Sequence, residues 1–312
     1  MKVALTGGSG FIGQAFLDRM LAVPGTSAAM HVKALSSSAQ GMERLRVKHP
    51  SLEVDVLYDR DGGVNADAFE GAHTVLHLGW SSVPGTAKAD PVADLRTNVE
   101  GGIALLQAMV RAGVQRIIFV SSGGTVYGDP VYLPIDERHP VAPRTPYGAS
   151  KLIFEHYLRC MADLHGFRPV VLRPGNIYGR TDGPEKPQGV VEHWFASIAS
   201  QRAVKVWNGL DVVRDYIHID DVVEVLIRLI RYDGEQRLFN VGTGIGTSLR
   251  DLALMMERVT GSPVVMDQTQ LAPPDVQANI LDPSLLIQEL GVPKAMALEE
   301  GLVRTWSRLA FR

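Results

Sequence analysis

The sequence of 312 residues has almost no cysteine. Its single cysteine, Cys160, excludes a disulfide within the chain and a cysteine-rich metal site. The histidines do not have the spacing of metal ligands, so we expect no metal. A lone cysteine is compatible with a reducing compartment, and we expect the protein to be cytoplasmic.

The sequence also lacks a strong net charge and a long apolar run. The formal net charge is −3 and the basic residues are scattered, so we expect neither nucleic acid nor a membrane as a partner. No apolar segment approaches the roughly 20 residues that span a membrane, and the apolar run at the N-terminus is too short for a signal peptide. The hydrophobic fraction of 46% instead indicates a soluble globular protein with one large domain or two lobes.

Short apolar runs alternate with helical patterns through the first half of the chain. Apolar residues spaced three and four apart predict helices at 11–21, 94–113 and 146–164. The apolar runs predict buried strands at 2–6, 31–35, 52–57, 74–79, 116–120 and 169–175. This alternation predicts an α/β fold with a Rossmann-type, doubly wound parallel sheet and helices on both of its faces.

The pattern changes after Pro174. Residues 179–190 are rich in glycine and proline and predict a loop, and shorter strands and helices follow it. We therefore expect a second, smaller α/β lobe that is interleaved with the first domain. The expected division assigns 1–174 and about 214–242 to the Rossmann-type domain, and 175–213 and 243–312 to the smaller lobe.

The residues that follow the first predicted strand read TGGSGFIG (6–13). Gly7 allows a tight turn, Gly10 lets backbone N–H groups approach a pyrophosphate, and Gly13 lets the next helix pack closely on the strand. Because the pattern lies between the first strand and the first helix, it predicts a dinucleotide-binding turn rather than a plain glycine turn.

The end of the second predicted strand carries neither signal that separates NAD from NADP. An acidic residue there would bond the adenosine ribose and an arginine would favour the 2′-phosphate, whereas the sequence has three serines, 36–38. Ser36 is a candidate cofactor contact or part of a serine-rich surface loop. Asp59, after the third strand, could accept a hydrogen bond from the adenine amino group or could be a solvated loop residue.

Tyr147 and Lys151 lie four residues apart near the start of a predicted helix. Thr145 can cap this helix, and Pro146 suits its first turn. The spacing places the phenol and the ammonium group on one helix face. We expect Lys151 and the helix N-terminus to lower the pKa of Tyr147, which would make the pair a general acid and base. The alternative is an ordinary surface pair.

Taken together, these motifs resemble the extended short-chain dehydrogenase/reductase family, and especially its nucleotide-sugar epimerases of the UDP-galactose 4-epimerase type. The motifs occur in family order, as TGGSGFIG (6–13), TVLHLG (74–79), TNVEGG (97–102), SSGGTVYG (121–128), YGASK (147–151), LRPGNIYG (172–179), VRDYIHIDD (213–221) and FNVGTG (239–244).

The resemblance implies NAD as the cofactor and a nucleotide-diphosphate sugar, expected to be a UDP-sugar, as the substrate. It implies epimerisation at C4 through a transient 4-keto sugar, with Tyr147 as the base and Lys151 bound to the nicotinamide ribose. It also implies a homodimer that forms through the helices at 94–113 and 146–164. The cofactor contacts that it adds to the glycines, Ser36 and Asp59 are Phe11, Ile12, Leu78, Gly79, Trp80, Asn98, Ser121, Tyr147, Lys151 and Pro174.

One residue of the catalytic pattern is missing. The family's usual catalytic serine or threonine lies four residues before Tyr127, where this sequence has Gly123. On an extended backbone Thr125 points to the same side as Gly123, and Ser122 directly precedes it. We expect Thr125 or Ser122 to supply the hydroxyl group, and the alternative is a site that relies on Tyr147 alone.

The resemblance also implies substrate contacts in the second half of the chain. Arg214 matches an arginine that binds the diphosphate, and Asn176 matches a residue that donates to the phosphates. Arg214 could instead pair with Asp215 or Asp220, and Asn176 could be a turn residue. Trp207 could flank the nucleotide base or could be core. The remaining expected substrate contacts are Thr125, Val190 and Asp275, and Ala272 stands where the family commonly has a phosphate-binding arginine.

Two rival functions remain open at this point. Ser36 is compatible with an NADPH-dependent nucleotide-sugar reductase, which would consume reduced cofactor. A non-catalytic dinucleotide-binding regulator is the other rival, although such relatives tend to lose the tyrosine and lysine that this chain keeps. A dehydratase is excluded, because Gly124 and Thr125 stand where family dehydratases carry an Asp-Glu pair.

Overall fold

The computed structural model describes residues 1–22, 30–180, 189–207, 209–268 and 276–310. They form two compact units, each assembled from segments that are separate in the sequence. The first unit comprises Met1–Val126, Thr145–Leu172 and Leu229–Leu238, and the second comprises Tyr127–Arg144, Arg173–Arg228 and Phe239–Arg312.

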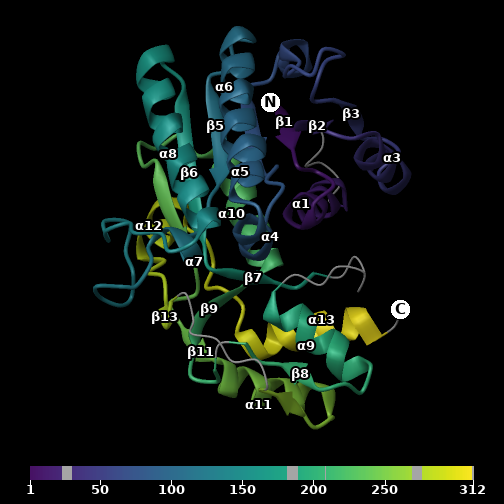
Figure 1. Ribbon diagram of the computed structural model, residues 1–312. Helices are drawn as coiled ribbons and strands as arrows, with labels where there is room; N and C mark the ends of the chain where they lie inside the picture. The colour runs from purple at the N-terminus through teal and green to yellow at the C-terminus, as the bar shows by residue number, and fades with distance from the viewer. Residues whose placement is uncertain (23–29, 181–188, 208, 269–275, 311–312) are drawn as a thin grey trace. The chain divides into compact units, whose positions relative to one another are not determined.

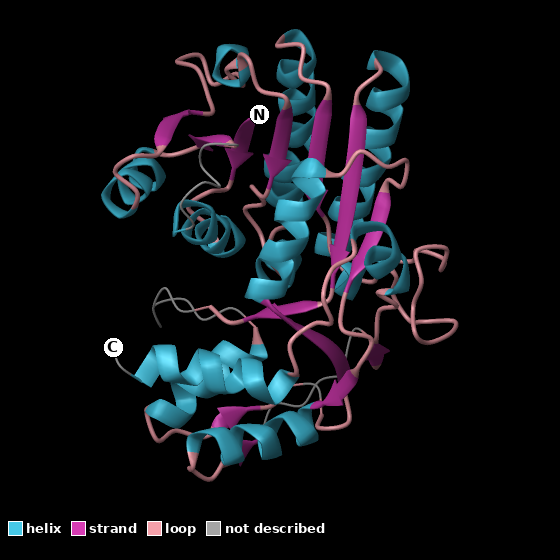
Figure 2. Cartoon of the chain, turned by 180° about the vertical axis from the view of Figure 1, so that it is seen from behind, coloured by secondary structure: helices cyan, strands magenta, loops and turns pink. Residues whose placement is uncertain are grey.

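A seven-stranded sheet forms the centre of the first unit, and Figure 2 shows its strands side by side. The strand order is β10-β6-β5-β4-β1-β2-β3, and each neighbouring pair from β6 to β3 is parallel. Every residue of β4 and β5 is buried, as expected for a parallel sheet that is covered on both faces. The predicted doubly wound α/β sheet is therefore confirmed. Its strands are β1 (Lys2–Thr6), β2 (His31–Ser36), β3 (Glu53–Val56), β4 (Thr74–His77), β5 (Arg116–Val120), β6 (Arg168–Pro174) and β10 (Leu238–Val241), of which β6 and β10 continue into the second unit.

Two long helices of the first unit, α6 and α8, run side by side along the sheet (Figure 1). Gly102 of α6 permits this close packing, because a Cβ atom there would lie 2.5 Å from the ring of Phe154 of α8. Phe154 and Phe119 of β5 belong to one buried core cluster. The helices of the first unit are α1 (Phe11–Ala22), α3 (Ala39–Lys48), η1 (Ala66–Phe69), α4 (Pro84–Ala89), α5 (Pro91–Asp94), the π-helical η2 (Leu95–Glu100), α6 (Gly101–Arg111), α7 (Gly123–Val126) and α8 (Pro146–His165).

The ends of α8 follow the sequence signals that predicted the helix. The hydroxyl group of Thr145 accepts a hydrogen bond from the backbone N–H of Gly148 at 3.2 Å, and Pro146 occupies the first turn. Gly166 ends the helix in the left-handed conformation, with φ of 74°. This capping fixes Tyr147 in the first turn and Lys151 one turn later.

The second unit is built around β9, which pairs with β7, β11 and β13. Its buried core includes Trp194, Phe195, Met256 and Leu302. No helix in the described ranges is long and apolar enough to cross a membrane. The elements are β7 (Asn176–Tyr178), α9 (Val190–Ala199), β8 (Val204–Lys205), β9 (Val213–His218), α10 (Ile219–Arg231), β11 (Gly246–Ser248), α11 (Leu249–Thr260), β12 (Met266–Asp267), β13 (Ala278–Asn279), α12 (Ser284–Leu290) and α13 (Leu298–Ala310), of which α10 continues into the first unit.

The two units divide the chain differently from the expected division. The loop at 127–144 lies in the second unit, where Tyr127 donates to Asn240 at 2.7 Å and the N–H of Ile135 donates to the carbonyl of Ile280 at 2.7 Å. Strand β9 also lies in the second unit, because its pairing partners are there. The expectation had placed both segments in the Rossmann-type domain.

Candidate active site

The strand order changes direction between β1 and β4, and ligands of doubly wound sheets bind outside the carboxyl ends of the strands at such a point. Gly7 follows β1 with φ of +73°, and a Cβ atom on it would lie 2.5 Å from the backbone N of Gly79, after β4. A Cβ atom on Gly13 would lie 2.3 Å from the carbonyl oxygen of Gly7. Gly7 and Gly13 therefore have the turn and packing roles that the sequence predicted.

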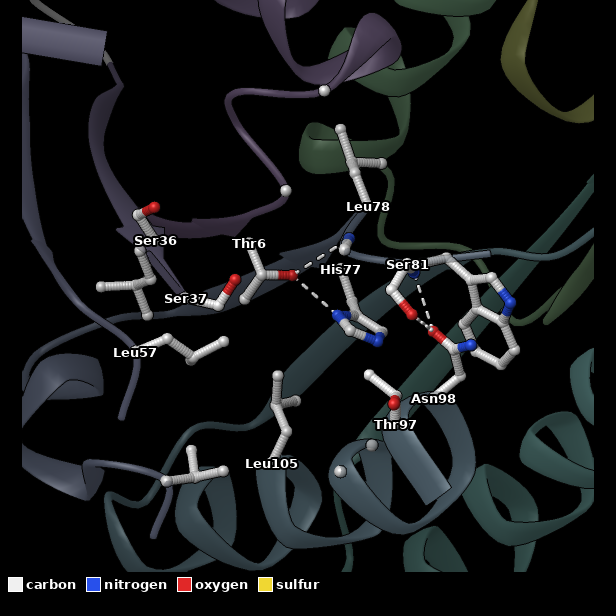
Figure 3. A pocket seen from close by; sticks show the side chains of 18 of the residues that line it. Thr6, Ser36, Ser37, Leu57, His77, Leu78, Ser81, Thr97, Asn98 and Leu105 are labelled. Carbon is white, nitrogen blue, oxygen red and sulfur yellow. Dashed lines mark hydrogen bonds between the residues drawn. The ribbon is translucent and has the colours of Figure 1, made fainter. Parts of the chain in front are cut away.

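A cavity of about 250 Å³ opens at this point of the sheet (Figure 3). Gly10 lines it, and a Cβ atom there would meet only the carbonyl oxygen of Gly7, at 3.2 Å, so the backbone is accessible to a ligand. Of the predicted cofactor contacts, those that line the cavity are Gly7, Gly10, Ser36, Leu78, Gly79, Trp80 and Asn98. The lining residues that the sequence did not single out are Thr6, Ser9, Leu35, Ser37, Leu57, Tyr58, Val64, His77, Ser81, Thr97, Gly101, Gly102 and Leu105. Thr6, Leu35, Ser37, Leu57 and His77 lie at strand ends or directly after them, which is the signal that could have identified them.

The remaining predicted cofactor contacts lie outside the cavity lining. Phe11, Ile12 and Gly13 begin α1, and Pro174 belongs to the second unit. Asp59 is exposed, and its Oδ1 accepts from the backbone N–H groups of Asp61 at 3.0 Å and Gly63 at 2.7 Å. These bonds fix the turn that contains Asp59, and its contact with the adenine amino group stays a prediction. The others outside the lining are Ser121, Tyr147 and Lys151.

His77 is a neutral group at the wall of the cavity. Its Nδ1 lies 2.7 Å from the hydroxyl oxygen of Thr6, as the dashed line in Figure 3 shows. Burial, with a smaller contribution from the charge of Lys151, lowers the pKa of His77 to about 3. Its Nε2 is buried and has no hydrogen-bond partner among the described residues. The cavity therefore has a polar wall that carries no charge at neutral pH.

Ser36 and Ser38 shape the edge of the cavity at the end of β2. Ser36 donates to the carbonyl oxygen of Ser38 at 3.0 Å, and the hydroxyl of Ser38 accepts from the N–H of Gly41 at 3.0 Å, which caps α3. The serine-rich stretch is therefore a helix start as well as cavity lining. It provides no carboxylate and no guanidinium that would select between NAD and NADP.

Lys151 reaches from α8 to the end of β5. Its Nζ donates to the carbonyl oxygen of Val120 at 2.8 Å and lies 5.6 Å from the ring centroid of Tyr147. Lys151 is only 3% exposed, and burial lowers the pKa of its ammonium group to about 7, although Glu155 and Asp94 oppose that shift. The pair predicted from YGASK is thus one buried cation beside one phenol.

The expectation that the pKa of Tyr147 is lowered is wrong for the protein without bound molecules. Burial, and then the negative charge of Asp94, raise the pKa of this phenol well above its usual value. The expectation counted only the ammonium group of Lys151 and the helix N-terminus. It missed Asp94, which lies 53 positions earlier in the sequence and reaches the site only through the fold.

Asp94 is the centre of a buried hydrogen-bond network that the sequence did not reveal. Its Oδ2 accepts from the hydroxyl of Ser150 at 2.5 Å, and its Oδ1 accepts from the amide of Asn98 at 2.9 Å. Asn98 Oδ1 in turn accepts from the N–H of Ser81 at 2.8 Å, at the cavity wall. A second carboxylate, that of Glu155, accepts a short hydrogen bond from Ser121. The network ties α8 to the residues around the cavity.

The strand-end hydroxyl groups lie on a helical turn instead of an extended backbone. Residues Gly123–Val126 form α7, and the N–H of Val126 bonds to the carbonyl of Ser122 at 3.1 Å. The alternation that placed Thr125 beside Gly123 is therefore wrong, because a helix replaces the strand. Ser122 and Thr125 are instead three residues apart on a helical turn, which brings them to one face. The hydroxyl oxygen of Thr125 is buried and has no hydrogen-bond partner among the described residues.

Comparison with known proteins identifies the family. The model of the NAD dependent epimerase/dehydratase family matches residues 3–242. The chain belongs to this family.

Individual relatives match over nearly the whole chain. A UDP-glucose 4-epimerase from Mycolicibacterium smegmatis is 32% identical over 314 residues, which cover 98% of this chain and 97% of the relative. The structure of UDP-glucose 4-epimerase from Thermotoga maritima with UDP-glucose has a TM-score of 0.86 and 29% identity, and covers 100% of this chain and 99% of that one. That of the Thermus thermophilus UDP-glucose 4-epimerase in complex with NAD has a TM-score of 0.85 and 29% identity, with 99% of each chain covered. The predicted family resemblance is confirmed.

Four of the predicted substrate contacts lie in the second unit, namely Asn176, Val190, Trp207 and Arg214. Arg214 donates through its two terminal nitrogens to the carbonyl oxygens of Val213 and Val276, each at 2.8 Å. Asn176 begins β7 and Val190 begins α9. Trp207 is 44% exposed and lies beyond the short strand β8, so it is not a core residue. Asp275 and Ala272 lie outside the described residues.

Proposed function

We propose that the protein is an NAD-dependent epimerase that inverts C4 of a UDP-sugar through a transient 4-keto sugar. The observation that carries the proposal is the placement of Tyr147 and Lys151 on one face of α8, with the buried ammonium group of Lys151 fixed at the end of β5. The family membership and the similarity to UDP-glucose 4-epimerases support the substrate class.

The residues around the cavity fit a dinucleotide. The glycine turn exposes backbone at Gly10, and the cavity lies at the switch point between β1 and β4. His77 keeps that wall neutral, and its Nε2 is left without a partner among the described residues. We assign the cofactor to this cavity, with Ser36 at the adenosine end.

The chain's own groups would move the proton. Bound NAD would accept a hydride from C4 of the sugar and later return it to the same carbon. Tyr147, as a phenolate, takes the proton from the sugar 4-hydroxyl and returns it after the 4-keto sugar has turned. Lys151 binds the nicotinamide ribose, and its positive charge favours the phenolate. Ser122 or Thr125 shares the proton transfer, and Arg214 and Asn176 bind the diphosphate.

The same proposal includes a homodimer and a cytoplasmic location. Ile153 and Tyr157 of α8 are 36% and 43% exposed and lie four residues apart, which forms an apolar strip on the helix. We assign the dimer contact to α8 and α6. Light scattering of the purified protein should give twice the chain mass, and Tyr157→Glu should give a monomer. A monomeric wild-type protein would refute this part of the proposal.

Proton NMR of the purified protein with NAD tests the function. UDP-glucose, UDP-N-acetylglucosamine and UDP-glucuronate are supplied in separate tubes. We expect the C4 epimer of at least one of them, without net accumulation of NADH, and no epimer with Tyr147→Phe. Net consumption of NADPH with a 4-keto sugar would favour the reductase, and bound NAD without turnover of any sugar would favour the non-catalytic regulator.

A further inference from the structure

The environment of the Lys151 ammonium group consists largely of aromatic rings. Among the described residues its hydrogen-bond acceptor is the carbonyl oxygen of Val120, whereas an ammonium group has three donors. The Nζ lies 4.0 Å from the ring centroid of Trp80, 4.8 Å from that of Phe119 and 5.6 Å from that of Tyr147. All three distances lie within the range of about 6 Å over which a ring face attracts a cation, and tryptophan attracts it most strongly.

Trp80 is both the nearest ring and a residue of the cavity wall. It follows β4 and lines the cavity that we assign to the cofactor. Its ring lies against Phe119 and Phe154, with centroid distances of 5.6 Å and 6.0 Å, so its orientation is set by the core. Its Nε1 is buried and has no hydrogen-bond partner among the described residues. The face of the indole, and not its N–H group, therefore makes the polar contact of this side chain.

The charges around Lys151 come from three elements. Asp94 of α5 and Glu155 of α8 favour the ammonium form, and His77 of β4 is neutral. Tyr147 of α8 is a neutral phenol at neutral pH, because its pKa is raised. Burial opposes the ammonium form and brings the pKa of Lys151 to about 7. The charge of Lys151 near neutral pH is therefore sensitive to a contact that favours the cation.

We propose that Trp80 is a positioning residue for Lys151, and that its indole face holds the ammonium group in place and in its charged form through a cation–π contact. The proposal deepens the function proposed above, because Lys151 matters to catalysis only if that function is right. It assigns to Trp80 a role beyond that of cavity wall. A hydrocarbon side chain of similar bulk would line the cavity equally well but would not bind the ammonium group.

Stepwise changes to the indole ring of Trp80 separate its role as cavity wall from its role in binding the ammonium group of Lys151. Tryptophan carrying one, two or three fluorine atoms is introduced at position 80 alone, since each fluorine weakens the negative face of the ring with little change of shape. Trp80→Phe keeps a weaker face, and Trp80→Leu keeps only apolar bulk. The matched control carries the same fluorinated tryptophans at the exposed Trp207.

The pKa of Lys151 is then measured directly by NMR of protein labelled at the lysine side chains, without cofactor or substrate. The Lys151 signal is one of eight lysine signals, and it is identified by its absence in the spectrum of Lys151→Met. We expect the pKa of Lys151 to fall with each fluorine, by about one pH unit over the whole series, and by a similar amount in Trp80→Leu. The pKa in Trp80→Phe should lie between those in wild type and in Trp80→Leu. Substitution at Trp207 should leave it unchanged.

Identical titration of Lys151 in wild type, the fluorinated series and Trp80→Leu would overturn the proposal and leave Trp80 as a cavity wall only. The titration needs no catalysis, so a failure of the proposed epimerase function would not affect it. In an active enzyme, the alkaline limb of the pH profile of kcat/KM should move to lower pH in the same order of variants.

Discussion

Lys151, Tyr147 and Asp94 form a coupled set of one buried cation, one phenol and one buried carboxylate. Burial disfavours the charged form of Lys151 and of Tyr147, and Asp94 favours the protonated form of both. The phenol therefore needs added positive charge before it becomes a base. Because Asp94 opposes ionisation of Tyr147, a bound molecule must supply enough positive charge to overcome the effect of this carboxylate on the pKa of the phenol.

Asp94→Asn should move the ascending limb of the pH profile of kcat/KM to lower pH. Removal of the negative charge lowers the pKa of Tyr147, so a smaller rise in pH forms the phenolate. The matched control is Glu100→Gln, which removes an exposed carboxylate from the neighbouring η2. A limb that stays in place in Asp94→Asn, or that moves equally in Glu100→Gln, would contradict this account.

Ser122 and Thr125 lie on the turn that begins α7, and their hydroxyl groups can be removed one at a time. Thr125→Val removes a buried oxygen that has no partner among the described residues, so stability should be unchanged or slightly higher. If Thr125 shares the proton transfer, kcat should fall by roughly 10²-fold, and Thr125→Ser should restore it. Ser122→Ala is measured in parallel. Full turnover in both Thr125→Val and Ser122→Ala would leave Tyr147 as the sole acid and base.

The burial of Lys151 also affects how the free energy of unfolding depends on pH. Its pKa is about 7 in the folded protein, against 10.5 for a lysine that is not buried, so between these pH values the unfolded chain binds more protons. Lys151 is therefore most destabilising below pH 7, and the cost disappears as pH rises towards 10.5. Lys151→Met should unfold with a free energy a few kcal/mol higher at about pH 7 than wild type, and the difference should shrink by pH 10. Denaturant unfolding at several pH values measures it, and a difference that grows with pH would contradict the shift.

Among the secondary-structure elements, the glycine turn between β1 and α1 packs so closely that a side chain at Gly13 would meet its backbone. Gly13→Ala would place a methyl group 2.3 Å from the carbonyl oxygen of Gly7, which is backbone and cannot move aside easily. We expect a loss of several kcal/mol in unfolding free energy and loss of NAD binding by calorimetry.

The matched control for this prediction is Gly85→Ala in α4, where a Cβ atom would meet nothing within 4 Å. This change should be neutral or stabilising by about 0.4–1 kcal/mol. Equal stability of the two variants would mean that the turn at Gly13 tolerates a side chain.

Local elements were largely predictable from the sequence, because local signals determine them. The limits of α8 follow from Thr145, Pro146 and Gly166, and six of the seven strands of the sheet follow from their apolar runs. The seventh strand, β10, was not among the predicted strands. The conformation of α7 was not predictable, because SSGGTVYG is compatible with a strand end as well as with a helical turn. The role of Asp94 was also hidden, because a carboxylate in a helical pattern is usually solvated and its partner Ser150 is 56 residues away.

At the scale of the whole molecule, the chain passes between two compact units several times. The fold class was predictable, because alternating strands and helices allow few architectures. The division was not, because the assignment of β9 depends on long-range pairing with β7, β11 and β13. The contacts of Asp215 were not predictable from the sequence for the same reason. It is fully buried and accepts hydrogen bonds from Thr243 and from the backbone of Gly244 and Leu281, which no local pattern indicates.

In the proposed reaction the hydride leaves C4 of the sugar and returns to the same carbon within one enzyme molecule. The most direct test supplies the UDP-sugar that turns over with deuterium at C4, together with the protein and unlabelled NAD. We expect a C4 epimer that retains the deuterium at C4, with none of it in free NADH, and no epimer from Tyr147→Phe. Loss of the label to solvent, or its appearance at another carbon, would exclude a hydride transfer that begins and ends at C4.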